Sequence, residues 1–440
     1  MLDLCNYAVT QAEKLGATEA EAFIQDLNSI EVAAELGEIS KVSKKQEGGI
    51  FVRLVKNKAL GFSYTNKLDK NSIEDATKRA FKASKSGKKD EDWVSLPERG
   101  SYPDLSLWDE KIPEIPPGEF VRIVREMIEK VPKDIMVAMA EGGLFYGHNY
   151  CTNSNGIEAQ DKGTGVFSFI YLIGKTDVGV TPGCFEFDAS RSYELDTDMI
   201  VENAVRDVEL SKKNLKPEAG LKKVVIAPNA LEQIFTYTLF EAVSGENIVR
   251  EKSALADKIG EVVSSERFSI SDNALHEKGL SSRAFDSEGV SSQKTKIVDR
   301  GVLKSFIWDN YWAKRVGGKS TGNAQRSLKF GSISVRPTNM VVERGECSFE
   351  ELIDVREGYL VKSFQGAHSS NPESGDFSVV CTPAFKIEEG EVVGGVSQMM
   401  LSDNIYNVLK RVSLIEEREK INQTLISPSI RFEGLNISTK

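Results

Sequence analysis

The sequence offers few side chains from which a metal site could be built. It contains three histidines, His148, His276 and His368. No two of them lie four residues apart, so no helix can present two imidazoles on one face, as a zinc-binding helix does. His148 lies in a Gly-His-Asn stretch typical of a surface loop, whereas His368 lies in a polar, glycine-containing loop that could line a cleft. The residues alone therefore predict no histidine-based metal centre.

A phosphate-binding loop is not predicted either. Gly318-Lys319-Ser320 matches the end of a P-loop, but no glycine stands where that loop requires its first one. The five cysteines are odd in number, scattered and without a Cys-x-x-Cys pair, which is typical of reduced thiols in a cytoplasmic protein. These are Cys5, Cys151, Cys184, Cys347 and Cys381.

In the N-terminal half, the order helix, strands, helix occurs twice. Apolar residues at helical spacing predict helices near residues 4–15, 69–86, 117–131 and 196–213. Alternating patterns between them predict short strands, which cover residues 20–26, 29–36, 39–46, 50–56, 59–65, 135–141, 143–149, 156–163 and 166–173. The pair Gly48-Gly49 falls between two of these strands.

The C-terminal half has a different pattern. A short strand at 223–227 and a helix at 228–243 precede many short strands separated by Gly, Asn and Ser turns. The fold class predicted is α+β, with helix–strands–helix units in the N-terminal half and a large, mostly antiparallel sheet system in the C-terminal half. We expect the polar, Pro-rich segment 87–117 to be a surface connection. Together with a second connection at 216–220, it divides the chain into domains at 1–95, 112–215 and 219–440.

Composition narrows the class of protein. The 440 residues exceed one hydrophobic core, and the net charge of −10 argues against a nucleic-acid partner, which needs a positive surface. No apolar run approaches the roughly 18–20 residues that span a bilayer. The N-terminus has no cationic stretch followed by an apolar one. We expect a soluble cytoplasmic protein without a membrane partner.

Several motifs, in a fixed order, resemble the TldD/PmbA family, once described as modulators of DNA gyrase. The resemblance rests on Gly16–Glu21, Gly48-Gly49, Asn153–Gly156, Phe285–Val290, Gln293–Thr295, Gly301–Lys304, Lys319–Ala324, Asn371–Ser378, Ile387–Val392 and Ser402–Asn404. It covers nearly the whole chain, and the order of the motifs carries it more than any one of them.

The resemblance implies a division of labour within the family. TldD-type members resemble zinc metalloproteases, in which a helix carries His-Glu-x-x-x-His and a late cysteine completes the site. The corresponding stretch here places Phe240 and Gly245 at the histidine positions and keeps Glu241 between them. The last cysteine, Cys381, precedes the Ile387–Val392 block instead of following it. No metal ligand, cofactor or catalytic residue is therefore expected at these degenerate positions.

This pattern is similar to the PmbA (TldE) arm of the family. It implies a non-catalytic subunit that pairs with a TldD-type, zinc-bearing paralogue in a protease complex acting on unfolded or extended peptides; a homodimer is left open. We expect Phe240 to pack inward with Leu239 and Phe235, Gly245 to end the helix, and Glu241 to make a structural hydrogen bond.

Two alternatives remain open. One is a stand-alone protein that binds peptides or modulates a topoisomerase. The other is a hydrolase whose metal is held by other residues, for example His368, Asp376 and Glu241. The loop Gln365–Phe377, with His368, Asn371, Gly375 and Asp376, is predicted to contact a peptide or partner in a cleft, the alternative being an ordinary hairpin connection.

Overall fold

The computed structural model describes residues 1–177, 179–327 and 331–439. The N-terminal half forms one antiparallel sheet in the order β3-β2-β1-β4-β5-β6, with β7 also pairing with β5. Its elements are α1 Leu2–Lys14, β1 Glu19–Glu35, β2 Glu38–Lys56, β3 Ala59–Thr65, α2 Lys70–Ser86, η1 Ile112–Glu114, α3 Pro117–Glu129, β4 Ile135–Asn153, β5 Glu158–Thr176, β6 Gly179–Val180, β7 Cys184–Ser190 and α4 Thr197–Lys212.

The C-terminal half is built on a 13-stranded sheet system. Its elements are β8 Gly220–Ile226, α5 Pro228–Thr236, α6 Leu239–Ala242, α7 Gly245–Val249, β9 Ile270–Asn273, β10 Lys294–Asp299, β11 Val302–Leu303, α8 Asn310–Arg315, β12 Ala324–Arg326, β13 Ile333–Val335, β14 Met340–Val342, α9 Phe349–Ile353, β15 Glu357–Val361, β16 Phe364–Gln365, η2 Ala367–Ser369, β17 Asp376–Cys381, β18 Ala384–Glu388, β19 Glu391–Val396, β20 Met399–Asn404, α10 Ile405–Leu409, β21 Val412–Ile421 and β22 Leu425–Thr439. Strands β12 and β13 pair with each other in a separate two-stranded sheet, and the other thirteen strands form the large sheet system. Two pairings of the large system, β14 with β22 and β8 with β15, are parallel, and its other pairings are antiparallel. The predicted α+β class is confirmed.

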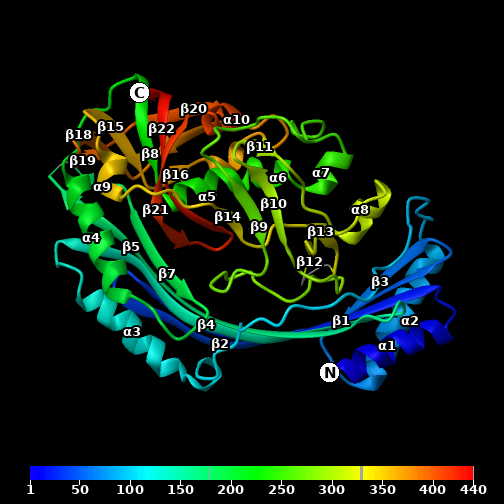
Figure 1. Cartoon of the computed structure of the whole chain (residues 1–440). Helices are drawn as coiled ribbons and strands as arrows, with labels where there is room; N and C mark the ends of the chain where they lie inside the picture. Colours follow the sequence, from blue (N-terminus) through cyan, green and yellow to red (C-terminus); the bar gives the residue numbers. More distant parts are fainter. Residues whose placement is uncertain (178, 328–330, 440) are drawn as a thin grey trace.

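The N-terminal sheet is a curved layer, and the C-terminal half lies on its concave side (Figure 1). Helices α1 and α2 cover one end of the convex face and α3 and α4 cover the other. Each helix pair has its own core: Ala8 and Ala12 of α1 pack near Ile24, while Phe120 and Val124 of α3 pack near Ile30. Alternate residues of the long strands thus face helices, and the others face the C-terminal half.

Several strands predicted as separate are continuous. β1 replaces the segments 20–26 and 29–36, and β4 and β5 likewise each merge two predicted segments. The pair Gly48-Gly49 lies within β2 instead of between strands. Position 48 requires glycine because a Cβ there would lie 2.0 Å from the carbonyl oxygen of Gln25 in β1. These glycines mark a close approach of two backbones.

The segments 1–95 and 112–215 contribute to the same sheet. β1 pairs with β4 along its length, from Glu21 opposite Asn153 to Glu35 opposite Met139. The two predicted N-terminal domains therefore each supply one strand of this central pair. A sheet that crosses this boundary makes the two segments one hydrogen-bonded layer.

The connection 87–117, predicted to lie on the surface, is partly buried. Trp93 and Leu96 are 4% and 0% exposed, and Trp93 stacks on Tyr311 with 6.2 Å between ring centroids. The side-chain amide of Asn310 donates to Ser95 O (2.8 Å), and that of Asn153 donates to Pro97 O (2.8 Å). The surface prediction was wrong here because both halves of the molecule hydrogen-bond to this backbone.

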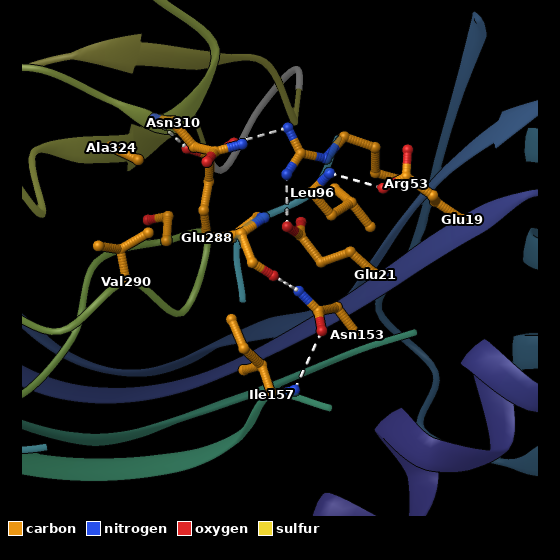
Figure 2. Close-up of polar contacts among 12 residues, drawn as sticks. Glu19, Glu21, Arg53, Leu96, Asn153, Ile157, Glu288, Val290, Asn310 and Ala324 are labelled. Carbon is orange, nitrogen blue, oxygen red and sulfur yellow. Dashed lines mark hydrogen bonds and ion pairs between the residues drawn. The ribbon is translucent and has the colours of Figure 1, made fainter. Parts of the chain in front are cut away.

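A buried charge network joins the two halves. Glu21 of β1 accepts hydrogen bonds from Arg53 of β2 and from Arg326 of β12. Arg53 also pairs with Glu288, at 2.8 Å between Nη1 and Oε1, and Glu288 accepts from the backbone N–H of Asn310 (2.9 Å; Figure 2). All four charged side chains are at most 4% exposed. We call Glu21, Arg53, Glu288 and Arg326 the ion lock.

Replacing Glu21 by glutamine tests the ion lock. The change leaves Arg53 and Arg326 buried without the carboxylate they share, and removing one partner of a buried pair costs roughly 3–5 kcal/mol of unfolding free energy. Glu126→Gln is the matched control, because Glu126 pairs with Arg122 on the exposed face of α3. Urea unfolding followed by circular dichroism should show a large loss for the first variant and a small one for the second; equal losses would contradict the ion lock.

Candidate functional site

The stretch that resembles the zinc-binding helix is broken into three short helices. α5 ends at Thr236, and Thr238 has φ −132° and ψ −83°, outside the helical region. Its hydroxyl donates to the carbonyl oxygen of Ile234 (2.6 Å). The predicted single helix over 228–243 was therefore wrong at its C-terminal end, since the chain turns before α6 and again before α7.

Phe240 lies in the core of the C-terminal half. Its side chain is 4% exposed and its ring centroid is 6.1 Å from that of Phe235. Leu239 belongs to the same core cluster. The predicted inward packing of Phe240 is confirmed.

Gly245 begins α7 instead of ending a helix, so that prediction was wrong. Its N–H donates to the carbonyl oxygen of Ile307 (2.8 Å), which ties α7 to the chain before Trp308. A Cβ on Gly245 would lie 2.1 Å from Cε3 of the Trp308 ring. No side chain fits at this position while Trp308 keeps its place.

Glu241 is engaged in ordinary polar contacts, as predicted. Its Oε1 pairs with Nη1 of Arg336 at 2.6 Å, and its Oε2 accepts from the side-chain amide of Asn247 (3.1 Å). The same amide donates to the Glu241 carbonyl oxygen (2.8 Å). These bonds hold α6 against α7 and give the carboxylate a structural role.

The residues present do not fit a zinc ion. An apolar ring and a glycine supply no lone pair, and Glu241 is occupied by Arg336. Cys381 is 1% exposed, and burial raises the pKa of its thiol, which disfavours the thiolate that zinc requires. His368, Asp376 and Glu241 are not brought together, and the described residues contain no cluster of three or more metal-ligating side chains.

The loop Gln365–Phe377 is bonded mainly to itself and to β20. Asn371 Oδ1 accepts from the N–H groups of Glu373 (2.9 Å) and Ser374 (3.2 Å), an arrangement typical of a tight turn. Asp376 accepts from the side-chain amide of Asn404 (2.8 Å), and a Cβ on Gly375 would lie 2.7 Å from Tyr406.

His368 is exposed, and neither it nor Asn371 nor Asp376 is among the residues that line the cleft described below. Only the start of the loop, at Gln365, reaches that cleft. A contact of His368 with a partner stays a prediction.

Residues 318–322, Gly-Lys-Ser-Thr-Gly, also spell the Gly-x-Ser-x-Gly pattern of a serine nucleophile. That chemistry requires a sharp strand-to-helix turn, whereas this stretch runs from α8 toward β12. The hydroxyl of Ser320 donates to the carbonyl oxygen of Trp308 (3.1 Å), not to a histidine. The residues serve the same packing around Trp308 that excludes a side chain at Gly245.

A feature that sequence reasoning missed is a cleft between the concave face and the C-terminal half, with a volume of about 1160 Å³. Its floor is a set of aromatic side chains from β4, β5 and β7, which are Phe145, Phe167, Phe169, Tyr171, Phe185 and Phe187. The opposite wall comes from α5, β16 and nearby loops of the C-terminal half. The two-residue spacing of Phe167, Phe169 and Tyr171 was the available signal, since such residues share one face of a strand.

A pair of glycine variants tests the packing at Trp308. Alanine in place of a helical glycine ordinarily stabilises by roughly 0.5–1 kcal/mol, as expected for Gly118→Ala in α3, where nothing lies within 4 Å of the added Cβ. Gly245→Ala should instead destabilise by roughly 1–3 kcal/mol, because the new methyl group overlaps the Trp308 ring. Urea midpoints should move in opposite directions; a stabilised Gly245→Ala variant would show that the site has room for a side chain.

No described helix combines the length and hydrophobicity needed to cross a bilayer.

Comparison with known proteins identifies the family. The model of the PmbA/TldA metallopeptidase C-terminal domain matches residues 219–439, and that of PmbA/TldA metallopeptidase domain 1 matches residues 20–84. The chain superposes on the crystal structure of TldE from Thermococcus kodakarensis with a TM-score of 0.95 and 34% identity, over 99% of this chain and 100% of that one.

Two further relatives are named as metalloproteases. The metalloprotease PmbA homolog of Haemophilus influenzae is 24% identical over 98% of this chain and 95% of its own length. The zinc metalloprotease TldD homolog of Saccharolobus solfataricus is 24% identical over 93% of this chain and 91% of its own. The matches cover both halves of the fold described above, and this chain belongs to the PmbA/TldD metallopeptidase family.

Proposed function

We propose that the chain is the non-catalytic subunit of a two-component metalloprotease, in which a TldD-type relative carries the zinc. The observation that supports this most directly is the packing of the two former ligand positions. Phe240 is part of the core, and Trp308 occupies the space that a side chain at position 245 would need. Hydrophobic packing thus occupies both positions that correspond to histidine ligands, while the family fold is kept.

In this proposal the substrate is an unfolded or extended peptide. Zinc chemistry would be supplied by the partner, and this chain would contribute surface for assembly and for holding the peptide. The relationship to the structure described as TldE supports the assignment to the subunit type without histidine ligands. Cytoplasmic location and pairing with a zinc-bearing paralogue are parts of the same proposal.

Reconstitution tests the proposal. The isolated chain should not digest an unstructured protein such as casein, and adding a TldD-type partner from the same source should give digestion that a chelator abolishes. The partner alone is the control for activity that does not need this chain. Chelator-sensitive digestion by this chain alone would overturn the non-catalytic assignment.

Glu241 provides an internal test of the same idea. If it only holds Arg336 and Asn247, Glu241→Ala should leave the activity of the reconstituted pair within about twofold, whereas loss of a general base costs roughly 10²–10⁴-fold. The variant Arg336→Ala removes the same ion pair from the other side and serves as the matched control. A loss of a hundredfold or more for Glu241→Ala alone would assign the carboxylate a chemical role.

A further inference from the structure

Two side chains of the aromatic floor are exposed despite their size. Phe185 and Tyr171 are 41% and 36% exposed, although they face the C-terminal half across the cleft. β5 and β7 pair so that Tyr171 lies opposite Phe185 and Phe169 lies opposite Phe187. On these two strands the aromatic side chains of the floor therefore repeat every second residue, the same repeat that an extended peptide has.

The opposite wall offers hydrogen-bonding groups of a particular kind. Asn229, Gln365 and Gln423 are among the residues that line the cleft, and their side-chain amides have no hydrogen-bond partner among the described residues. An amide both donates and accepts, as a peptide backbone does, so these groups can pair with a chain of any sequence.

The charges of the cleft argue against an anionic ligand. Three charged side chains line it in the described part of the chain. Lys362 is paired with Asp207 (2.6 Å), so its charge is already compensated. Glu232 accepts from the backbone N–H groups of Thr424 (2.7 Å) and Leu425 (3.0 Å). Glu141 is the third, and burial, followed by the charge of Glu31, raises the pKa of its carboxyl. A phosphate would find no free cation here, whereas a neutral or basic apolar segment is tolerated.

Backbone N–H groups of β7 already have hydrogen-bond partners, which limits how a peptide could bind at this strand. The N–H groups of Phe187 and Ala189 donate to the preceding carboxylates of Glu186 (3.2 Å) and Asp188 (2.9 Å). Lys420 of β21 reaches Glu186 and lies 4.7 Å from the centre of the Phe187 ring. These contacts disfavour the addition of a strand at this edge. A bound peptide would therefore lie on top of the aromatic floor and not beside β7.

From these observations we infer that the cleft binds an extended peptide segment rich in apolar or aromatic side chains, with those side chains on the Phe145–Phe187 floor and its backbone on the free amides of the opposite wall. This inference rests on the proposed function, since it names the part of this chain that takes hold of the unfolded substrate. It adds a binding site that belongs to this subunit alone and works without the partner's zinc.

The test is peptide binding by the isolated chain, measured by fluorescence anisotropy. The probe is a labelled, unstructured Lys-containing peptide with Phe or Leu at every second position, compared with the same peptide carrying Ser at those positions. The first peptide should bind and the second should not. Phe185→Asp should weaken binding at least about tenfold, because it places a charge where the bound peptide would bury an apolar side chain. Gln365→Ala should weaken it several-fold through loss of one amide.

The matched control is Phe62→Asp. Phe62 is 43% exposed on β3, the edge strand at the other end of the same sheet, so the two substitutions put equal strain on folding. Equal affinities of the Phe185→Asp and Phe62→Asp variants, or equal binding of both peptides, would overturn the inference. So would a chain that binds no peptide but self-associates through this cleft, seen as a dimer that Phe185→Asp alone dissociates.

A reconstituted pair that is active while the isolated chain binds no peptide would overturn peptide binding in the cleft and leave the proposed function standing. The reverse result, binding without activity of the pair, would do the opposite.

Discussion

The ion lock is the interaction on which the relative position of the two halves depends. Glu21 and Arg53 stand on neighbouring strands of the N-terminal sheet, and Glu288 and Arg326 come from the C-terminal half. If the halves separated, Glu288 and Arg326 would lose the partners that pair with them across the boundary, and Glu21 and Arg53 would each keep only one of two partners. Removing a partner from a buried ion pair is strongly destabilising. The two halves are therefore held as one body, and the space between them has a fixed width.

A second set of contacts fixes that width near the cleft. Arg191, just after β7, donates to the carbonyl oxygens of Gly279 (2.9 Å) and Ser282 (3.0 Å) of the C-terminal half. Burial lowers the pKa of Arg191 to about 10, which leaves it charged at neutral pH. The ion lock on β1 and β2 and Arg191 after β7 thus join the two halves at separate places, and the cleft with its aromatic floor lies between the halves. Contacts that hold the two walls in place keep such a cleft open for a ligand.

The sequence predicted the helices of the N-terminal half well, because amphipathic spacing is local. The N-caps Asp69 and Asp196, each accepting a backbone N–H at 2.9 Å, lie at the predicted starts of α2 and α4. Strand continuity through Gly48 and the burial of Trp93 were missed, because both depend on partners more than twenty residues away. At the degenerate site, the identity of Phe240 and Gly245 was visible in the sequence, but the reason for the glycine was not. Glycine is required because the ring of Trp308 fills the space beside position 245. Trp308 lies 63 residues later in the sequence, so no local sequence pattern predicts this contact.

The main proposal is that this chain pairs with a TldD-type subunit that holds the zinc ion, and that this chain holds none. Metal content of the two subunits, purified separately and as a pair and measured by native mass spectrometry, tests it most directly. We predict one zinc ion in the pair, retained by the TldD-type subunit on separation, and none in this chain. A stoichiometric zinc ion that stays with this chain after separation would contradict the claim.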